Sequence, residues 1–562
     1  MKKIPNLHPG MGNPLQHIAD LVHIMYTWGI RDVVMSPGSR NAPLIHGFVH
    51  CEQVSCHSIP DERVAGYFAL GIALKTGRPV IVLCTSGTAA LNLAPALAEA
   101  YYQHVPLVAI TADRPADVVE TQQNQTLLQE DLFNNYTKGF LNWSHESADE
   151  KALEALLCLA AASHPGPIHL NVPIKEPLYR PLPQPRRCSL SFAPKEVKRD
   201  MIPEDLVVAL QRAQRILILC GQQRPDPSLL QVLKAIAQRQ QAVVVAEAVS
   251  NLNDATICYA TDALAAHLLN SDDRAYVPDL MFSTGGHIVS KQWLLWMQRH
   301  PELVHWRISE APDQLDTYGN LSGLVVGESA RVLQALFPNS HAPCSAYVER
   351  WRAFHHRVEH LLQDHLREIP FSDLYLFGQL VSNLPKGSHL HLGNGSAIRY
   401  AQMFPLDSSL TVYGNRGVSG IDGSLSTAVG ISKADPSTQN ILLIGDMSFV
   451  YDSNALWNRN MPSNLHIVII NNGGGGIFRL MEGPSQYRGF EDYQVAHHPV
   501  ALGELAKAFG WSHRLWQSKE DLQKGLPILL DPPGRTIIEV KTPVQENGNS
   551  YQSYYKKLKN NR

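Results

Sequence analysis

The chain has 562 residues, of which 44% are hydrophobic and 18% charged, and 48 basic against 51 acidic side chains leave a formal net charge of −3. This length and composition predict three or four globular domains and exclude a disordered protein. The near-neutral balance excludes a global positive field that would hold nucleic acid or an anionic membrane. No apolar run reaches the ~18–20 residues of a bilayer span, and residues 1–20 lack the apolar segment of a signal peptide, so we expect a cytoplasmic protein without membrane insertion.

Short β-branched runs alternate with helix-like segments from the start of the chain. In the first third we expect helices at 63–75 and 88–100, and strands at 32–35, 79–84 and 106–111. These strands are apolar throughout, which favours a parallel sheet that is covered on both faces. The strand–helix alternation predicts right-handed crossovers and a doubly wound sheet.

A proline-rich stretch, 173–194, with the pair Arg186-Arg187 inside it, predicts an extended interdomain connection. The alternation then resumes, with a helix expected at 228–239 and strands at 215–220, 242–246 and 280–283. A polar helix rich in aromatic residues, at 346–367, leads to a third block with strands at 389–392, 441–444 and 466–470. The sequence therefore predicts three α/β domains, at 1–185, 186–365 and 366–562.

The eight cysteines are scattered thinly, and none forms a CxxC pair. Cys51 and Cys56 have no second pair that would complete a zinc site. We expect these thiols to be small buried side chains in a reducing compartment.

Polar residues end two neighbouring apolar strands of the third block. Asp446 ends the run Ile-Leu-Leu-Ile-Gly-Asp, and Asn471-Asn472 followed by four glycines ends the next, with a crossover helix expected at about 452–459. Parallel strands joined in this way bring their carboxyl ends to within ~5–10 Å, where α/β sheets bind ligands. A carboxylate, an amide oxygen and a glycine carbonyl suit Mg²⁺, which takes its remaining ligands from water and substrate phosphates. The alternative is a plain turn after a strand.

Glu62, in Ile59-Pro-Asp-Glu-Arg63, opens a predicted helix. Arginines lie in or near turns rich in Gly, Ser and Asn, namely Arg40, Arg114, Arg399 and Arg416. A guanidinium there can clamp a carboxylate with two hydrogen bonds. The alternatives are a helix cap for Glu62 and ordinary surface ion pairs for the arginines, but four such turns on one edge of their sheets suit substrates with several carboxylates.

These segments resemble the thiamine-diphosphate-dependent enzymes. The motifs SPGSR, DER, TSGTA, TADRP, NRGVSGIDG, GDMS and NNGGGGIF carry the resemblance through the first and third blocks, and Lys291 carries most of it in the middle block. Within that class the pattern is similar to the synthases of menaquinone biosynthesis, transferases that decarboxylate 2-oxoglutarate and add the resulting carbanion to isochorismate, releasing CO2. Two positions depart from the pattern: Met447 replaces a common glycine and Gly395 replaces a common serine.

The resemblance implies a pyrimidine-binding, a transhydrogenase-like middle and a diphosphate-binding domain. It implies thiamine diphosphate with Mg²⁺ or Mn²⁺, bound between the first domain of one subunit and the third of another. A dimer is then the minimum active unit, and a homotetramer is expected. Glu62 is expected to be catalytic, because it would hydrogen-bond the aminopyrimidine ring nitrogen of the cofactor.

The resemblance also assigns the remaining site residues. The expected metal ligands are Asp446, Asn472 and the Gly474 carbonyl. The expected cofactor contacts are Glu62, Gly393, Asn394, Ile421, Gly445, Asp446, Met447, Ser448, Asn472, Gly474, Ile477 and Phe478. The expected substrate contacts are Ser39, Arg40, Arg114, Asn124, Gln125, Lys291, Asn394, Arg399 and Arg416. For Ile421, Ile477 and Phe478, ordinary core packing is the alternative.

Two other functions compete with this hypothesis. A 2-oxoacid decarboxylase or an acetolactate-type synthase would handle small monocarboxylates and would not need the arginine-rich turns. A dinucleotide-binding α/β protein would carry GxGxxG opening a helix after its first strand, and the sequence has no well-placed instance.

Overall fold

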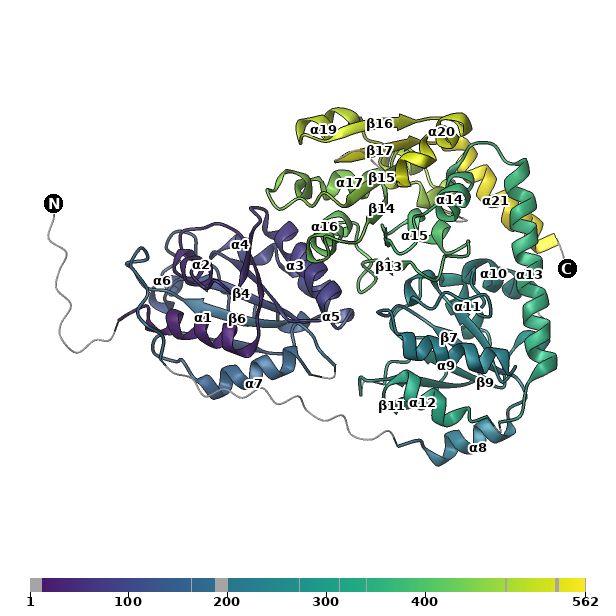
Figure 1. Ribbon diagram of the computed structural model, residues 1–562, viewed down its shortest axis with the longest axis horizontal. Coiled ribbons are helices and arrows are strands. Elements are labelled where there is room, and N and C mark those ends of the chain that lie inside the picture. The colour runs from purple at the N-terminus through teal and green to yellow at the C-terminus, as the bar shows by residue number, and fades with distance from the viewer. Residues whose placement is uncertain are drawn as a thin grey trace. The chain divides into compact units, whose positions relative to one another are not determined.

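The computed structural model describes residues 13–162, 164–186, 201–271, 273–312, 314–339, 341–480, 483–530 and 535–560. These residues form three sheets in which the paired strands are parallel, which confirms the predicted α/β class (Figure 1). The chain divides into two compact units. The first unit comprises Met1–Glu196, Ser426–Asp435 and Asn454–Pro462, and the second comprises Val197–Leu425, Pro436–Ser453 and Ser463–Arg562.

The first unit contains a six-stranded sheet of order β2-β1-β3-β4-β6-β5. Its strands are β1 (Asp32–Met35), β2 (Ser55–Ser58), β3 (Val80–Cys84), β4 (Leu107–Asp113), β5 (Phe140–Asn142) and β6 (Ile168–Pro173). Its helices are α1 (Gln16–Trp28), α2 (Ala42–Val49), α3 (Glu62–Thr76), α4 (Thr88–Leu91), α5 (Ala94–Tyr102), α6 (Ala116–Glu120), α7 (Glu150–Ala160) and most of α16 (Ser424–Ala434). Met35 pairs with Ser58 and Leu83, so the carboxyl ends of β1, β2 and β3 meet at one edge.

Local chemistry sets the helix boundaries in the first unit. The Asp61 side chain accepts a hydrogen bond of 3.1 Å from the Val64 amide and caps α3, and Gly77 ends that helix with φ of 70°. The single helix expected at 88–100 is wrong, because α4 ends at Leu91 and α5 begins at Ala94. Pro95 lies in the first turn of α5, where its missing N–H is tolerated, and it could not continue α4.

Helix α16 joins the first unit through close backbone contact with α3. A Cβ atom at Gly71 would lie 2.2 Å from the Thr427 carbonyl oxygen, and one at Gly430 would lie 2.2 Å from that of Phe68. Only glycine allows the two helices to approach this closely. Lys75 and Asp435 add an ion pair of 2.6 Å at the end of this contact.

The second unit contains two sheets, of order β11-β10-β9-β7-β8 and β13-β12-β14-β15-β17-β16. The middle part contains β7 (Ile216–Cys220), β8 (Val243–Ala246), β9 (Leu280–Thr284), β10 (Val304–Ser309), β11 (Leu321–Val326), α8 (Glu204–Arg212), α9 (Pro227–Gln238), α10 (Thr261–Ser271), α11 (Lys291–Gln298) and α12 (Ser329–Leu336). The last part contains β12 (His389–Leu392), β13 (Thr411–Tyr413), β14 (Asn440–Gly445), β15 (Leu465–Asn471), β16 (Ser512–Trp516), β17 (Thr536–Lys541), α14 (Asp373–Ser382), α15 (Ser396–Ala401), α17 (Asp446–Tyr451), α18 (Ile477–Leu480), α19 (Leu502–Ala508), α20 (Lys519–Leu530) and α21 (Val544–Asn560).

The long helix α13 (Ser345–Glu368) connects the two sheets of the second unit and confirms the helix expected at 346–367 (Figure 1). Its buried side chains recur every three or four residues and pack into one apolar core that extends into both sheets. The two sheets therefore share a core. The boundaries at 185 and 365 stay predictions, and residues 187–200 of the expected connection lie outside the described part of the chain.

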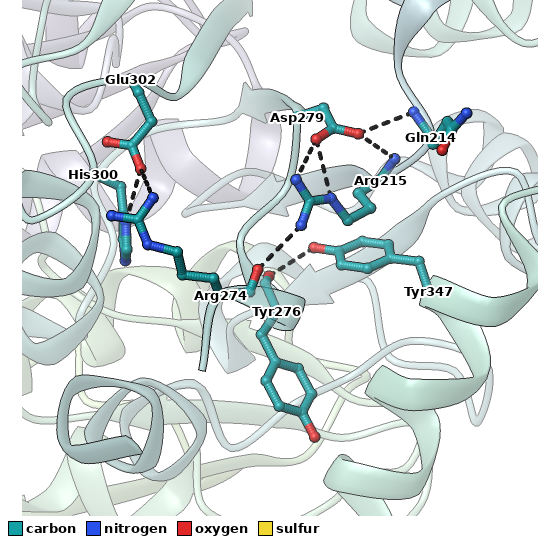
Figure 2. A network of polar contacts seen from close by, with 8 residues as sticks. All are labelled: Gln214, Arg215, Arg274, Tyr276, Asp279, His300, Glu302 and Tyr347. Atoms are coloured by element: carbon teal, nitrogen blue, oxygen red, sulfur yellow. Dashed lines mark hydrogen bonds and ion pairs between the residues drawn. The ribbon is translucent and has the colours of Figure 1, made fainter. Parts of the chain in front are cut away.

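A polar network holds the amino-terminal edge of the middle sheet (Figure 2). Asp279, which precedes β9, accepts hydrogen bonds from the backbone amides of Gln214 and Arg215 and, at 3.0 Å, from Arg215 Nε. Tyr347 of α13 donates a 2.9 Å bond to the Tyr276 carbonyl nearby. These contacts fix where β7 and β9 begin. The loops that bear candidate site residues lie at the opposite edge of the sheet.

The crossover helix expected at 452–459 begins earlier than predicted. Helix α17 starts at Asp446 itself, and a 3-10 helix follows at Ser453–Trp457. The backbone turns directly from β14 into a helix, so Asp446 lies in a first helical turn. In the described ranges we find no helix long and apolar enough to cross a membrane.

Candidate functional site

Asp446 lies at the carboxyl end of β14, beside the glycine-rich loop that follows β15. It is 1% exposed, and its Oδ2 accepts hydrogen bonds from the amides of Gly473 (3.0 Å) and Gly474 (2.8 Å). Its Oδ1 accepts one from Met447 N, and His498 Nε2 lies 3.5 Å from Oδ2. Burial raises the pKa of Asp446, and the backbone hydrogen bonds and the His498 charge oppose that shift. The expected proximity of the two strand ends is therefore found.

Asn472 presents a free oxygen at the same place. It is 4% exposed, and its Nδ2 donates a 2.8 Å hydrogen bond to Asp373 Oδ2. Its Oδ1 is buried and has no hydrogen-bond partner among the described residues. A buried amide oxygen left in this state carries a desolvation cost unless a ligand or water satisfies it. This oxygen, together with the Asp446 carboxylate, fits a hard cation.

The glycine loop has the shape of a cradle. A Cβ at Gly476 would lie 2.6–2.7 Å from the amide atoms of Asn472, and one at Gly474, whose φ is 124°, would lie 2.6 Å from the Val495 carbonyl oxygen. The Gly474 carbonyl accepts a 2.8 Å bond from Gly476 N, and its second lone pair is the one that could face a cation. No group of three His, Cys, Asp or Glu side chains within the described ranges could hold a metal, so a metal here would need amide and carbonyl oxygens besides the Asp446 carboxylate.

Asp373 was missed by sequence analysis because it stands next to Ser372 at a helix start and looks like a cap. It is 1% exposed, and Thr542 Oγ1 donates a 2.6 Å bond to its Oδ1. Burial raises the pKa of Asp373 to about 6, against the hydrogen bonds from Thr542 and Asn472. Neither its position in the sequence nor its neighbours signal this contact with Asn472, which lies 99 residues later.

A second group of predicted residues surrounds Asn394. Its Nδ2 donates bonds of 2.7 Å to the carbonyls of Asn415 and Gly420, and its Oδ1 accepts one of 2.8 Å from Arg416. Asn394 therefore orders the 415–420 loop. In the same part of the unit, Ser448 Oγ donates a 2.8 Å bond to the Ile421 carbonyl.

The glycine at position 395 suits its turn. Its φ of 97° is a conformation that side chains rarely adopt, and a Cβ there would meet open space. Arg399 donates a 2.9 Å bond to the Gly395 carbonyl from the last turn of α15. Ile477 and Phe478, in α18, are partly buried, and Gly393 lies against Ile444.

The middle sheet contributes charged groups near the Arg416 loop. Glu247 is fully buried, accepts a 2.9 Å bond from Ser290 N and has its pKa raised to about 7 by burial, with the Arg416 charge opposing. Burial and then the charges of Arg416 and Arg307 lower the pKa of His287. Gln222, in the middle part of the unit, donates a 2.9 Å hydrogen bond to the Gly414 carbonyl in the last part. Lys291 begins α11 and is exposed.

The first unit holds the other predicted residues along the carboxyl edge of its sheet. Glu62 is the first residue of α3, and burial, helped by the charge of Asp61, raises the pKa of its carboxyl above the ordinary value. A Cβ at Gly38 would lie 2.4 Å from the Thr85 side chain, so the SPGSR and TSGTA loops touch. Gln125 donates a 3.1 Å bond to the Ser86 carbonyl, and Asn124 and Ser39 are exposed.

Two of the predicted arginines lie together at this edge. Arg40 is 6% exposed, donates a 2.8 Å bond to the Ile174 carbonyl and lies 3.1 Å from Glu176 Oε1. Burial lowers the pKa of Arg40, and the nearby charge of Arg114 lowers it further. Arg114 Nε is buried and has no hydrogen-bond partner in the described ranges. Arg40 Nε is likewise buried without a partner there, so two close cations, each with an unused donor, fit an anionic ligand.

Comparison with known families agrees with this fold and geometry. The family model described as "Thiamine pyrophosphate enzyme, N-terminal TPP binding domain" matches residues 17–134, and "Thiamine pyrophosphate enzyme, C-terminal TPP binding domain" matches residues 393–540. The first match covers Glu62 and the arginine pair, and the second covers Asp446 and the glycine loop. The chain therefore has the fold and both cofactor-binding domains of a thiamine pyrophosphate enzyme.

Similar proteins narrow the assignment. Proteins from Desulfotalea psychrophila (38% identical; 92% of this chain and 99% of the relative), Flavobacterium johnsoniae (36%; 96% and 98%) and Bacteroides thetaiotaomicron (34%; 97% and 99%) share the name 2-succinyl-5-enolpyruvyl-6-hydroxy-3-cyclohexene-1-carboxylate synthase. The chain belongs to this synthase family, which confirms the resemblance drawn from its motifs.

Proposed function

We propose that this protein decarboxylates 2-oxoglutarate and joins the remaining four-carbon unit to isochorismate, giving 2-succinyl-5-enolpyruvyl-6-hydroxy-3-cyclohexene-1-carboxylate and CO2 in menaquinone biosynthesis. The observation that carries the proposal is the buried, unpartnered Asn472 Oδ1 beside Asp446, in a chain 38% identical to a named synthase. A cation-binding oxygen pair at a glycine cradle is what a diphosphate cofactor needs.

Three oxygens would hold Mg²⁺ or Mn²⁺: a carboxylate oxygen of Asp446, Asn472 Oδ1 and the Gly474 carbonyl. The remaining cofactor contacts would be Gly393, Asn394, Ile421, Gly445, Met447, Ser448, Ile477 and Phe478. When bound, thiamine diphosphate supplies the electron sink that decarboxylation of a 2-oxoacid requires. The chain contributes binding, orientation, protection from water and a proton relay.

Glu62 would hold the hydrogen bond to the ring nitrogen of the aminopyrimidine. The raised pKa of its carboxyl supports this role, because a carboxyl that retains its proton more readily is better able to share that proton with the ring nitrogen. Ile421, Ile477 and Phe478 would exclude water. Water exclusion matters because protonation after CO2 loss would release a semialdehyde instead of product.

The cations would bind and orient the carboxylates of both substrates. Arg40 and Arg114 form one pair, and Arg399, Arg416 and Lys291 would act from the second unit, with Ser39, Asn124, Gln125 and Asn394 as hydrogen-bonding partners. Two substrates with several carboxylates give a reason for this many cations in a chain whose net charge is −3. A decarboxylase of small monocarboxylates would not need them.

We propose a homodimer as the minimum active unit, with the first domain of one subunit facing the third domain of the other, and a homotetramer in the cytoplasm. The cytoplasmic location is supported by the seven described cysteines, which are all free thiols. Mass photometry would test the oligomeric state, because a monomer that turned over substrates at full rate would contradict the shared site.

The deciding experiment measures CO2 release and product formation by the purified protein with thiamine diphosphate and Mg²⁺. With 2-oxoglutarate and isochorismate together we expect stoichiometric CO2 and the named product by mass spectrometry. With pyruvate in place of 2-oxoglutarate we expect little turnover, and EDTA should abolish the reaction. Efficient turnover of pyruvate, or no binding of the cofactor at micromolar concentration, would contradict the proposal.

A further inference from the structure

We propose that Asp373 is a positioning residue that decides which end of the Asn472 side-chain amide faces the metal position. The inference rests on the proposed metal site and concerns a residue that contacts one of its expected ligands without being a ligand itself. Asp373 begins α14, is 1% exposed and accepts a 2.8 Å hydrogen bond from Asn472 Nδ2.

An asparagine amide has two different ends. Its oxygen accepts hydrogen bonds and can bind a cation, whereas its NH2 group donates hydrogen bonds and cannot. A carboxylate only accepts hydrogen bonds. The Asn472 amide can therefore bond to Asp373 only when its NH2 group faces Asp373. The reversed amide would place two acceptor oxygens against each other. Asp373 therefore turns Asn472 Oδ1 away from itself, and this oxygen is the one left without a partner.

Asp373 is itself held by two other segments of the second unit. Thr542, just after β17, donates a 2.6 Å bond to Asp373 Oδ1, and Asn547 of α21 donates a 2.9 Å bond to Thr542 Oγ1. The Asn547 oxygen accepts a 2.7 Å bond from the Asp373 backbone amide, which closes a ring. The ring engages Oδ1 of Asp373, and Oδ2 is the oxygen that accepts the bond from Asn472.

The glycine loop limits the amide from another side. A Cβ at Gly476 would lie within 2.7 Å of the Asn472 amide, so this amide rests directly on the loop backbone. Outer partners of metal ligands typically change metal affinity by roughly 10–100-fold when they are removed. Loss of the orienting carboxylate should fall in that range, because the oxygen would no longer be preset toward the cation.

The test compares cation affinity in the full-length wild type and in Asp373→Asn, at pH 8, by Mn²⁺ titration followed by electron paramagnetic resonance in the presence of thiamine diphosphate. An asparagine at 373 keeps the size of the side chain but can pair with either end of the Asn472 amide. We expect Mn²⁺ affinity to fall by roughly 10–100-fold. Affinity within twofold of wild type would overturn the inference.

Thr542→Val is the matched control, because it removes the other partner of the carboxylate and leaves the Asn472 contact in place. It should change Mn²⁺ affinity much less than Asp373→Asn does, and an equal loss would mean that the ring acts only as packing. The double variant Asp373→Asn/Asn472→Asp provides a rescue. Asp at 472 presents an oxygen at both ends, so cation affinity should return, and failure to return would overturn the inference even if Asp373→Asn alone did not fold.

These outcomes separate the inference from the proposed function. If the wild type bound neither Mn²⁺ nor thiamine diphosphate, both the proposed function and the proposed metal site would be wrong. If the wild type bound both and Asp373→Asn matched it, the proposed function would stand and only the role of Asp373 would be lost.

Discussion

Asn454 Nδ2 donates a hydrogen bond of 2.6 Å to Asp61 Oδ2, although the two residues lie 393 positions apart in the chain. The other oxygen of Asp61 caps helix α3 through the Val64 amide. Asn460, from the same late segment, donates a 2.8 Å bond to the Ser58 carbonyl. The turn that leads into Glu62 is thus held at both ends by residues 454–462, which belong to the first unit.

This pair can be tested by exchanging its members. Asn454→Asp would place a carboxylate against Asp61, and the lost bond, worth about 1 kcal/mol, should lower the thermal midpoint by about 2–4 °C. The added negative charge should also raise the pKa of Glu62 further and shift the acidic limb of the activity profile to higher pH. Calorimetry and pH–rate measurements would record both effects.

The double variant Asn454→Asp/Asp61→Asn restores a donor and an acceptor across the contact. Asparagine caps helices about as well as aspartate, so the Val64 bond survives. Both the thermal midpoint and the pH profile should return toward wild type. A double variant no better than Asn454→Asp would show that the pair does not set the Glu62 turn.

Replacement of Glu62 separates cofactor binding from turnover. Glu62→Gln keeps the size of the side chain and removes its ability to share a proton, so kcat should fall by roughly 10²-fold or more. Affinity for thiamine diphosphate, measured by calorimetry, should change only a few-fold. Glu52→Gln, on the exposed surface of the same unit, is the control and should leave both quantities unchanged. A fully active Glu62→Gln enzyme would remove Glu62 from the catalytic role.

The meeting of the Asp446 and Asn472 strand ends could be predicted because its signals are local. Two buried apolar strands, each ending in a polar group, place Asp446 and Asn472 at one sheet edge, and the pairing of Gly445 with Ile470 confirms that register. The break between α4 and α5 also had a local signal, Pro95, which our prediction of one helix at 88–100 overlooked. The start of α17 at Asp446 was missed because the sequence at Asp446 is equally typical of the end of a strand and of the start of a helix.

Contacts between distant segments carried no such signal. Asp373 meets Asn472 across 99 residues, and Asn454 meets Asp61 across 393, through ordinary polar side chains. A helix-capping pattern is all that the sequence shows at 372–373. The partners of such residues are set by how sheets and helices pack, which one sequence does not reveal.

Gly476 should tolerate no side chain, because a Cβ there would meet the Asn472 amide at 2.6–2.7 Å. Gly476→Ala should displace that amide and weaken binding of Mg²⁺ with thiamine diphosphate by tenfold or more, measured by calorimetry. Gly548→Ala is the control: its Cβ would meet only the Arg479 carbonyl oxygen, at 3.9 Å, and it lies inside α21, where alanine is more stable than glycine by about 0.5–1 kcal/mol. Equal cofactor affinity in the two variants would contradict a tight cradle.

His169 should make the first unit less stable in acid. Thr111 donates its hydroxyl proton to Asn171, so at 2.8 Å it must accept one from His169 Nε2, which leaves the buried Nδ1 unprotonated and without a partner in the described structure. Burial lowers the pKa of His169 from 6.5 to about 3. Unfolding therefore takes up a proton between these values, and the free energy of unfolding should fall as pH drops below 6.5, by at most about 1.4 kcal/mol per pH unit.

His169→Gln keeps a donor for Thr111 but does not titrate, so urea unfolding between pH 8 and 5 should show a shallower pH dependence than in wild type. The exposed His50→Gln should keep the wild-type slope, and parallel curves for all three proteins would show that His169 does not control acid stability.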